Sequence, residues 1–299
     1  MKIGFYGLGK MGANMVARLI VKGQDVVVMN RSPEPVEAAV KIGALAAENY
    51  QDLIAKLDPV IIWLMLPADI IEAKFNELLP LLPEGAIVID GGNSDFRHSQ
   101  KRYEAAKARK VHFVDVGTSG GILGRKDGYC LMVGGDDQPV SLLKPVFDAL
   151  AAPYGWRHFN QPGAGHFVKM VHNAIEYGMM QSYGEGYRVL KEGPYKGLDL
   201  ATAGEVWQHG SIIESKLNEL TVQAIRENPE LEGIEGMVSE SGEARWTLEL
   251  ADEMNLPMPA IKAAFDVRLK SQHGQTNFST KLLAAMRNKF GGHDINPPN

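Results

Sequence analysis

The sequence has only one cysteine, Cys130, in 299 residues. A single thiol excludes a framework of intramolecular disulfides and fits a reducing compartment. Cys130 lies in the strand-like run Tyr-Cys-Leu-Met-Val. This setting predicts a small buried side chain rather than a nucleophile.

Long apolar runs are also absent. The longest, at residues 60–66, is far too short to span a bilayer and is typical of a buried parallel strand. The chain opens directly with a strand-like segment and shows no signal peptide. We therefore expect a soluble protein of the cytoplasm.

The charge pattern excludes a further class of partner. The formal net charge is −5, and no basic cluster is long enough to follow a phosphate backbone, so nucleic acid is not expected to bind. The composition is otherwise that of an ordinary globular protein, with 45% hydrophobic and 22% charged residues. The length fits about two domains.

What the sequence does contain begins with a glycine-rich turn. Residues 2–6 predict a strand, a turn follows at 7–12, residues 13–21 have helical spacing, and residues 25–30 predict a second strand. In such a unit the glycines allow a tight turn and let a dinucleotide pyrophosphate approach the helix N-terminus. The alternative is a turn with no ligand. The predicted dinucleotide site uses Gly7, Leu8, Gly9, Lys10, Met11 and Gly12.

The end of the second strand bears on which dinucleotide binds. An NAD site commonly has Asp or Glu there to accept from the ribose 2′-hydroxyl, whereas this chain has Asn30, Arg31 and Ser32. The guanidinium of Arg31 can pair with a 2′-phosphate, with Asn30 and Ser32 donating beside it. The sequence thus favours NADP, and NAD is the alternative if Arg31 is only a solvated turn residue.

Further β–α units continue to about residue 160. Strands are expected at 60–66, 86–90, 111–116, 129–134 and 155–159, after a short segment at 44–47, and helices at 34–42, 49–56, 69–79 and 95–109. Ligands bind at the carboxyl ends of strands in such sheets. The candidates at those ends are Leu66 and Pro67 for the cofactor, Asn93 for cofactor and substrate, and the loop residues Ser119, Gly120 and Gly121 for an oxyanion. For Asn93 and Ser119 a turn-forming role is the alternative.

Beyond residue 161 the pattern changes. Strand-like segments stop, and helical segments follow at about 165–192, 199–225, 240–254, 257–270 and 279–288. The expected fold class is α/β, with an N-terminal Rossmann doubly wound sheet in residues 1–161 and an all-helical domain in residues 162–299. A cleft between two such domains is the expected place for a substrate.

One stripe of polar residues opens the helical half. Lys169, His172, Asn173 and Glu176 fall at i, i+3, i+4 and i+7, so they share one side of a helix whose other residues are mostly apolar. Polar groups in such a helix usually face a cavity, because burying them unpaired is costly. A lysine and a glutamate there can serve as an acid–base pair, and the alternative is an ion pair with satisfied core partners.

Four motifs together resemble signatures of the 6-phosphogluconate dehydrogenase (decarboxylating) family, in its short form, within the β-hydroxyacid dehydrogenase superfamily. They are the turn at 7–12, Asp90-Gly-Gly-Asn-Ser94, Gly117-Thr-Ser-Gly-Gly121 and the segment 166–177. The resemblance implies that Lys169 is the general base and Glu176 the general acid. It also implies a set of residues that hold the sugar acid, namely Asn93, Ser119, Gly120, Gly121, His172, Asn173 and Tyr177.

Two later segments extend the resemblance. Residues 241–247 are similar to the family's phosphate-contacting segment, which implies that role for Arg245 and Thr247. Residues 287–293 are similar to a tail that reaches a neighbouring subunit's site. This implies that Arg287 and His293 contact substrate across the interface of a homodimer or homotetramer.

Glu214 departs from the pattern of the family. It stands where longer members have an arginine that grips the substrate phosphate, and a carboxylate there would repel a phosphate. Either the preferred substrate differs slightly, or other cations hold the phosphate. The candidates are Arg245, Arg287 and either Lys262 or Lys216.

The implied chemistry is an oxidation followed by loss of CO2. A base must take the proton of the C3 hydroxyl while hydride leaves C3 for the nicotinamide, and Lys169 can do this only when neutral, which burial favours. Protonated Lys169 then donates to the new carbonyl as CO2 leaves, and Glu176 protonates C1 of the enediol. No metal is needed, and the sequence has no HExxH motif, clustered Asp pair or Cys/His set to bind one.

The sequence therefore predicts conversion of 6-phospho-D-gluconate and NADP+ into D-ribulose 5-phosphate, CO2 and NADPH, a reaction of the pentose phosphate pathway. One alternative is a non-decarboxylating β-hydroxyacid dehydrogenase that acts on a related sugar acid. The other is a non-catalytic protein that senses dinucleotides.

Overall fold

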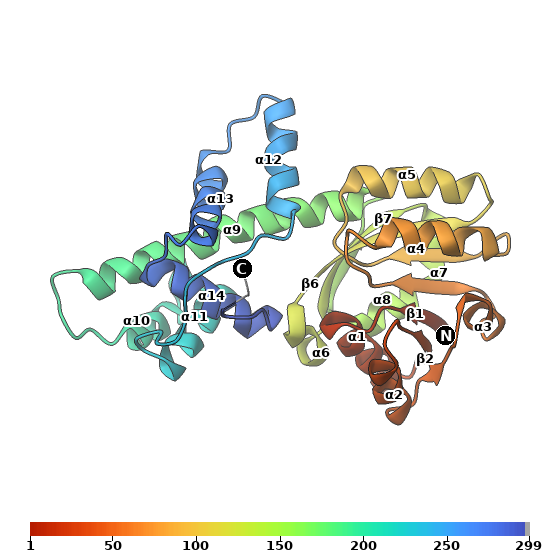
Figure 1. The fold of residues 1–299 in the computed structure, drawn as a ribbon, viewed down its shortest axis with the longest axis horizontal. Coiled ribbons are helices and arrows are strands. Elements are labelled where there is room, and N and C mark those ends of the chain that lie inside the picture. Colours follow the sequence, from red (N-terminus) through yellow and green to blue (C-terminus); the bar gives the residue numbers. More distant parts are fainter. Residues whose placement is uncertain (297–299) are drawn as a thin grey trace. The chain divides into compact units, whose positions relative to one another are not determined.

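The computed structural model describes residues 1–296, and the chain divides into two compact units, Met1–Met170 and Val171–Asn299. Unit 1 contains a sheet with helices on its faces, and unit 2 is helical (Figure 1). The predicted fold class, α/β with a helical second part, is confirmed.

The sheet of unit 1 has eight strands in the order β3-β2-β1-β4-β5-β6-β7-β8. Every neighbouring pair is parallel except β6 with β7. The order reverses direction between β1 and β4, which is where doubly wound sheets bind ligands. The strands are β1 (Lys2–Tyr6), β2 (Asp25–Met29), β3 (Leu45–Ala46), β4 (Ile61–Leu64), β5 (Ile87–Asp90), β6 (His112–Ser119), β7 (Tyr129–Gly135) and β8 (Ala151–His158).

Helices cover both faces of this sheet. One face packs against α1 (Lys10–Val21), α2 (Pro33–Lys41) and α8 (Lys144–Leu150), and the other against α3 (Tyr50–Ala55), α4 (Ile71–Leu78) and α5 (Phe96–Lys107). The central strands are apolar on both sides because both sides are covered. The remaining helical segments are η1 (Leu79–Leu81), η2 (Gly121–Leu123), α6 (Gly124–Asp127) and α7 (Asp137–Leu142).

The end of β6 differs from the prediction. Residues 117–119 were expected in a loop, but they continue the strand, because the antiparallel partner β7 pairs with them as far as Ser119 opposite Cys130. Only Gly120 and Gly121, with φ of 122° and 53°, make the turn.

Cys130 was expected to be buried, and this prediction is wrong, because its side chain is exposed. Neighbouring side chains on a strand point to opposite faces. Tyr129 and Leu131 take the core side of β7, which leaves the other side to Cys130.

The helix α9 (Ala164–Glu192) begins in unit 1 and continues into unit 2 as one unbroken helix (Figure 1). The core of unit 2 gathers apolar residues such as Met180, Tyr187 and Leu283. Its other helices are α10 (Leu200–Trp207), α11 (Lys216–Glu227), α12 (Glu243–Glu253), α13 (Pro259–Gln272) and α14 (Phe278–Gly291).

The single helix predicted at 199–225 is wrong, because residues 208–215 separate α10 from α11. Gly210, two residues beyond the C-cap of α10, has φ of 87°, a left-handed conformation that a continuous helix does not contain. Ser215 then caps α11, its side chain accepting from the Asn218 N–H. The apolar spacing on both sides hid these two signals.

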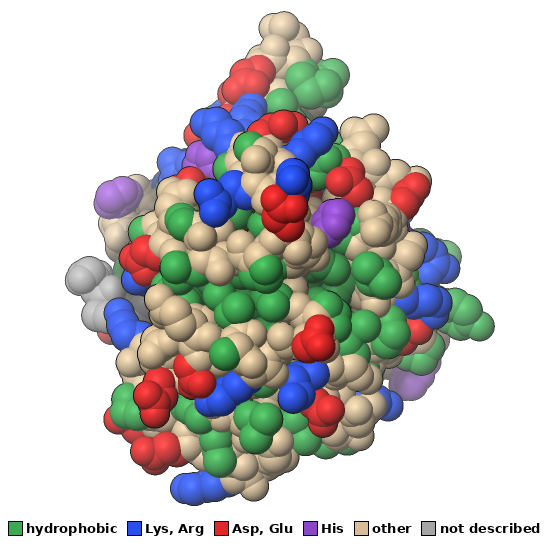
Figure 2. All heavy atoms as spheres, turned by 90° about the vertical axis from the view of Figure 1, so that its right-hand side faces the viewer, with side chains coloured by type: hydrophobic (Ala, Val, Ile, Leu, Met, Phe, Trp, Pro, Cys, Tyr) green, Lys and Arg blue, Asp and Glu red, His purple; other side chains and the backbone are tan. Residues whose placement is uncertain are grey.

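Within residues 1–296 there is no helix both long and apolar enough to cross a membrane. On the face shown in Figure 2, Lys and Arg side chains are interspersed with Asp and Glu side chains. This mixture agrees with a net charge of only −5.

Candidate active site

The glycine-rich turn between β1 and α1 needs glycine at two positions. Gly7 has φ of 106°, and a Cβ there would collide with the carbonyl oxygen of Met65. A Cβ on Gly12 would collide with the carbonyl oxygen of Gly7. Gly9 has open space where its Cβ would be, so a ligand can approach the backbone at that position.

The start of α1 fits a diphosphate. Gly9 is the N-cap, no side chain caps the helix, and the first turn contains no acidic residue. The first N–H groups of a helix have no partner within it and carry partial positive charge, which favours an anion. Lys10 and Met11 supply this backbone. Lys10 is exposed and Met11 is half-buried.

The polar residues after β2 have different tasks. The Asn30 side chain accepts from the Leu8 N–H at 2.9 Å and donates to the Ser32 carbonyl at 3.1 Å, so Asn30 holds the turn. Arg31 is exposed and makes no ion pair within residues 1–296. The side chain of Leu66, after β4, lies beside Gly7, and Pro67 is exposed next to it.

The loop after β5 is held by a buried charge network. Asp90 is fully buried and accepts from Arg102 at 2.8 Å, from the Ser94 hydroxyl at 2.9 Å and from the Gly92 N–H at 3.2 Å. Arg102 also donates to Glu72 at 3.0 Å. This network fixes the loop from which Asn93 is exposed.

The first turn of α9 is anchored to the sheet by Asp115. This fully buried carboxylate on β6 accepts from the N–H groups of Gly163 at 2.7 Å and His166 at 2.9 Å. Burial raises its pKa, although His166 and the two N–H groups act against the rise. Gly134 and Gly165 leave no room for a Cβ between helix and sheet.

Lys169 follows one turn later and is only 6% exposed. Its Cβ packs against Gly117 of β6, where any side chain would collide with it. Lys169 also lies within electrostatic reach of Cys130, which pairs with Ser119 across β6 and β7. The structure thus brings together Lys169 and Ser119, two residues predicted from the sequence.

A chain of hydrogen bonds connects α9 to α12 in unit 2. His172 Nδ1 lies 2.9 Å from Asn173 Oδ1, and Asn173 Nδ2 donates to Glu243 Oε1 at 2.7 Å. The other oxygen of buried Glu243 accepts from the Ser241 hydroxyl at 2.7 Å. Glu243 therefore fixes the orientation of the predicted substrate residue Asn173.

The other two predicted residues of this stretch, Glu176 and Tyr177, lie near two buried arginines. The guanidinium of Arg268 stacks on the Tyr177 ring with its carbon 3.3 Å from the ring centre. Glu176 lies within electrostatic reach of Arg268 and of Arg287 on α14. Burial lowers the pKa of Arg268 to about 10, so Arg268 is charged at neutral pH, and burial also lowers the pKa of Arg287.

Arg268 is the functional candidate that the sequence analysis missed. Its side chain is 2% exposed, its Nε has no hydrogen-bond partner, its Nη2 donates to Met180 Sδ at 3.4 Å, and it makes no ion pair among residues 1–296. Arg287 is also buried and donates to the Ser239 hydroxyl at 3.1 Å. Buried charges usually have partners, so this pair suits an anionic ligand.

The remaining candidates for the phosphate have partners of their own. Exposed Arg245 pairs with Glu240 at 2.6 Å, and the Thr247 hydroxyl donates to the Glu243 carbonyl at 2.8 Å. Lys216 pairs with Glu219 at 2.9 Å, whereas Lys262 is exposed.

Glu214 and His293 are both exposed. Glu214 lies in the connection between α10 and α11, and His293 follows α14. The predicted contact of Arg287 and His293 across subunits stays a prediction.

The candidate residues therefore form two groups, one in each unit. Unit 1 holds the glycine turn, Arg31, Asn93, Ser119 and Lys169, and unit 2 holds His172, Asn173, Glu176, Tyr177 and the two arginines. Helix α9 carries members of both groups. Among residues 1–296 no group of three or more His, Cys, Asp or Glu side chains could hold a metal ion.

Family models match both parts of the chain. Residues 2–163 match the NAD binding domain of 6-phosphogluconate dehydrogenase, and residues 165–285 match the C-terminal domain of 6-phosphogluconate dehydrogenase. The two matches together cover most of the chain.

Two relatives match almost end to end. A Haloferax volcanii protein named NAD(+)-dependent, decarboxylating 6-phosphogluconate dehydrogenase is 41% identical over 99% of this chain and 98% of its own. YqeC of Bacillus subtilis, provisionally named a 6-phosphogluconate dehydrogenase, is 39% identical over 98% of both chains.

A solved structure has the same fold. Plasmodium falciparum 6-phosphogluconate dehydrogenase, determined in its apo form and with NADP+ and 6-phosphogluconate, matches with a TM-score of 0.84 at 27% identity. The match covers 96% of this chain and 70% of that one.

Proposed function

Because this chain belongs to the 6-phosphogluconate dehydrogenase family, we propose that it oxidises and decarboxylates 6-phospho-D-gluconate to D-ribulose 5-phosphate and CO2. A nicotinamide dinucleotide accepts the hydride from C3 of the substrate. The observation that carries the proposal is Lys169, a buried amine on a helix start fixed by Asp115.

Lys169 acts first as general base. In its neutral form the buried amine takes the proton of the C3 hydroxyl as hydride leaves C3. Gly117 leaves the lysine stem room to lie against β6, and Ser119 is at the end of the same strand. The rigid support limits the positions that the amine can take.

Lys169 then returns its proton to the new C3 carbonyl oxygen while the bond between C1 and C2 breaks and CO2 leaves. The enediol that remains needs a proton on the carbon that becomes C1 of the product. Glu176 supplies that proton, and the enediol hydroxyl gives its own proton back to a base. Overall, 6-phosphogluconate and the oxidised cofactor give ribulose 5-phosphate, CO2 and the reduced cofactor.

The cofactor that we propose is NADP. The open backbone at Gly9 and the uncapped start of α1 support a site for its diphosphate. The exposed guanidinium of Arg31, without an ion pair among residues 1–296, supports binding of the 2′-phosphate. NAD remains the alternative, and the Haloferax volcanii relative is named as NAD(+)-dependent.

We also propose that Arg268 and Arg287 bind the substrate phosphate. Both are buried cations without a carboxylate partner among residues 1–296, and Arg268 stacks on Tyr177. A phosphate offers the planar, bidentate contacts that guanidinium groups form best. This assignment removes the need for a cation at the position of Glu214.

The test of the reaction is a comparison of initial rates with 6-phosphogluconate and gluconate, each with NADP+ and with NAD+, while CO2 is measured. We expect the fastest rate with 6-phosphogluconate and NADP+, and one CO2 for each reduced cofactor. Reduced cofactor without CO2 would instead indicate a non-decarboxylating β-hydroxyacid dehydrogenase. No reduced cofactor with any sugar acid would indicate a protein that only senses dinucleotides.

The test of the base is Lys169→Met, which keeps the length of the side chain and removes the amine. Turnover should be lost while the cofactor still binds with unchanged affinity. Lys41→Met, on the exposed end of α2, is the matched control and should keep full activity. Turnover retained by Lys169→Met would refute the assignment of the base.

The test of the cofactor is Arg31→Ala. The substitution should weaken NADP+ far more than NAD+, because only NADP+ carries the 2′-phosphate. Equal losses for both cofactors would show that Arg31 does not read that phosphate.

A further inference from the structure

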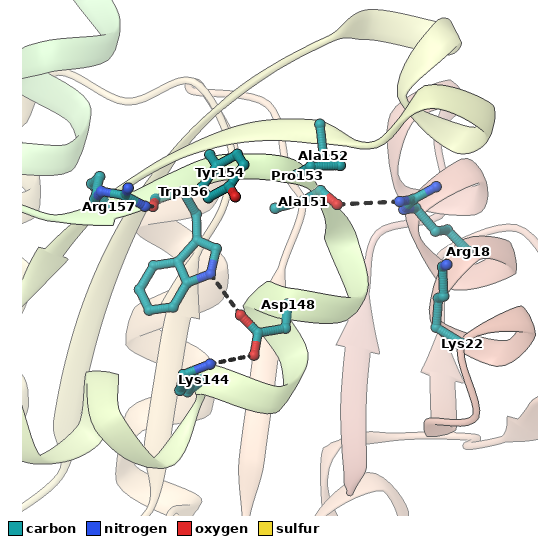
Figure 3. A pocket seen from close by; sticks show the side chains of 10 residues that line it. All are labelled: Arg18, Lys22, Lys144, Asp148, Ala151, Ala152, Pro153, Tyr154, Trp156 and Arg157. Carbon is teal, nitrogen blue, oxygen red and sulfur yellow. Dashed lines mark hydrogen bonds and ion pairs between the residues drawn. The ribbon is translucent and has the colours of Figure 1, made fainter.

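A cavity of about 490 Å3 opens on unit 1 at the edge of the sheet (Figure 3). It is lined by α1, α8 and β8, the last strand in the sheet order. Arg18, in the last turn of α1, and Lys22, its C-cap, lie at the opposite end of that helix from Gly9. A helix of this length spans about 18 Å, so the cavity is separate from the glycine-rich turn.

One wall of the cavity is an irregular stretch of β8. Tyr129 of β7 pairs with Ala151, but Leu131 pairs with Trp156, so residues 152–155 leave the ladder. Tyr154 has φ of 60°, which is rare for a bulky residue, and its side chain is 92% exposed. Such bulges re-aim side chains, and here the aromatic ring of Tyr154 is presented at the cavity.

A second aromatic side chain is fixed inside the cavity. Trp156 donates its indole N–H to Asp148 at 2.8 Å and packs against Phe147 with the ring centres 5.1 Å apart. Figure 3 shows the Trp156 indole pointing toward the Asp148 carboxylate, and Tyr154, two residues earlier on β8, also lines the cavity. The cavity therefore has an aromatic side held in place by its own contacts.

The lining of the cavity is strongly cationic. Four cations, Arg18, Lys22, Lys144 and Arg157, line it with one carboxylate, Asp148, whereas the whole chain has a net charge of −5. Lys144 pairs with Asp148 at 2.5 Å, and this leaves three positive charges uncompensated by the lining. A concave site with one sign of charge concentrates counter-ions.

Not all of these cations are equally available. Arg18 donates to several backbone carbonyl groups, among them those of Leu150 at 2.9 Å and Lys126 at 3.1 Å, so it shapes the wall while keeping its charge. Lys22 makes no ion pair with any residue in 1–296, and Arg157 donates to the Trp156 carbonyl at 2.7 Å. Lys22, one helical turn beyond Arg18, is therefore the group that can bind an anion, whereas Figure 3 shows Arg157 on the far side of Trp156 from both of them.

We propose that this cavity binds a small nucleotide, with its phosphates at Lys22 beside Arg18 and its base against Tyr154 and Trp156. The volume falls within the range of small-molecule sites, and the combination of cations with aromatic rings matches the two ends of a nucleotide. This site is additional to the one that we assign to the redox cofactor, and it does not depend on the reaction proposed above.

The experiment is calorimetric titration of ADP, pyrophosphate and adenosine into the full chain with the redox-cofactor site saturated by NADP+. ADP should bind, pyrophosphate should bind more weakly, and adenosine weakest of all. Lys22→Ala should weaken ADP about tenfold, whereas Lys41→Ala, outside the cavity, should change nothing. Tyr154→Gly keeps the backbone conformation, because glycine accepts φ of 60°, and it should weaken ADP but not pyrophosphate.

Thermal unfolding of each variant checks that the fold is kept, and Lys22 is well suited because it has no ion pair to lose among residues 1–296. Equal binding of pyrophosphate and ADP, with no effect of Tyr154→Gly, would overturn the nucleotide assignment. Absence of ADP binding would overturn the site altogether. The bulge would then serve only to keep the edge strand from pairing with another chain.

Discussion

Unit 1 and unit 2 both bury charged side chains, but they provide those side chains with different partners. In unit 1, buried Asp90 and Arg102 bond to each other, and buried Asp115 accepts two backbone N–H groups. In unit 2, buried Arg268 has no carboxylate partner among residues 1–296 and stacks on an aromatic ring instead.

The difference distinguishes buried charges that stabilise the fold from buried charges that are available to a ligand. A buried charge with its hydrogen bonds complete lowers the energy of one arrangement of the chain. A buried charge without a partner costs free energy in the free protein, and a ligand of opposite charge can recover that cost. By this criterion Asp90 and Asp115 position other residues, whereas Arg268 is a binding residue.

The largest expected effect is on the charge network of unit 1. Asp90→Ala leaves Arg102 buried with only exposed Glu72 and the Ser94 hydroxyl to accept from it, and breaking such a pair costs about 3 kcal/mol. Urea unfolding should report this loss in the free energy of unfolding. The control is Lys110→Ala, which removes an exposed pair with Glu84 and should cost less than about 1 kcal/mol. If the two variants lost the same free energy of unfolding, the assignment of a structural role to the network would be wrong.

Arg268→Met should leave stability intact but weaken substrate binding, the opposite of the effect expected for Asp90→Ala. No ion pair among residues 1–296 is lost, so the free energy of unfolding should stay the same or increase. The KM for 6-phosphogluconate should rise about 30-fold, since a charged hydrogen bond contributes about 2 kcal/mol. The KM for gluconate, which has no phosphate, should not change.

Arg226→Met is the matched control for Arg268→Met. Arg226 is exposed and bound to Glu205, so its loss should change neither stability nor KM by more than about twofold. If Arg226→Met raised the KM for 6-phosphogluconate as much as Arg268→Met, the contrast between paired and unpaired arginines would fail.

The smallest effect concerns the pH dependence of Asp115. Burial raises the pKa of this carboxyl in the folded protein above its ordinary value of 3.8. As pH rises above that value, the unfolded chain loses the proton more readily than the folded one, so the contribution of Asp115 to stability falls. The free energy of unfolding of the wild type minus that of Asp115→Asn should therefore decrease from pH 4 to pH 7. A difference that increases with pH would contradict the assigned direction.

The parts of the site that could be predicted from sequence are those that depend on local geometry. The collisions that demand glycine at Gly7 and Gly12 arise within one turn and the strand beside it. The stripe on α9 likewise depends only on helical spacing, and the helix is continuous over all four of its residues.

The parts that could not be predicted depend on contacts between distant segments. The burial of Arg268 comes from its packing on Tyr177, far earlier in the chain. A weak signal existed, since Ala264, Arg268 and Ser271 share the buried face of α13. The anchoring of α9 by Asp115 and the exposure of Cys130 depend in the same way on how β6 and β7 pair.

The exposed thiol of Cys130 has a practical consequence. It is the only thiol of the chain, and it lies within electrostatic reach of Lys169. A fluorophore or spin label attached to the native protein would therefore sit at one known place, within electrostatic reach of that amine, with no engineered mutation. A change in its signal on addition of 6-phosphogluconate would report binding near Lys169.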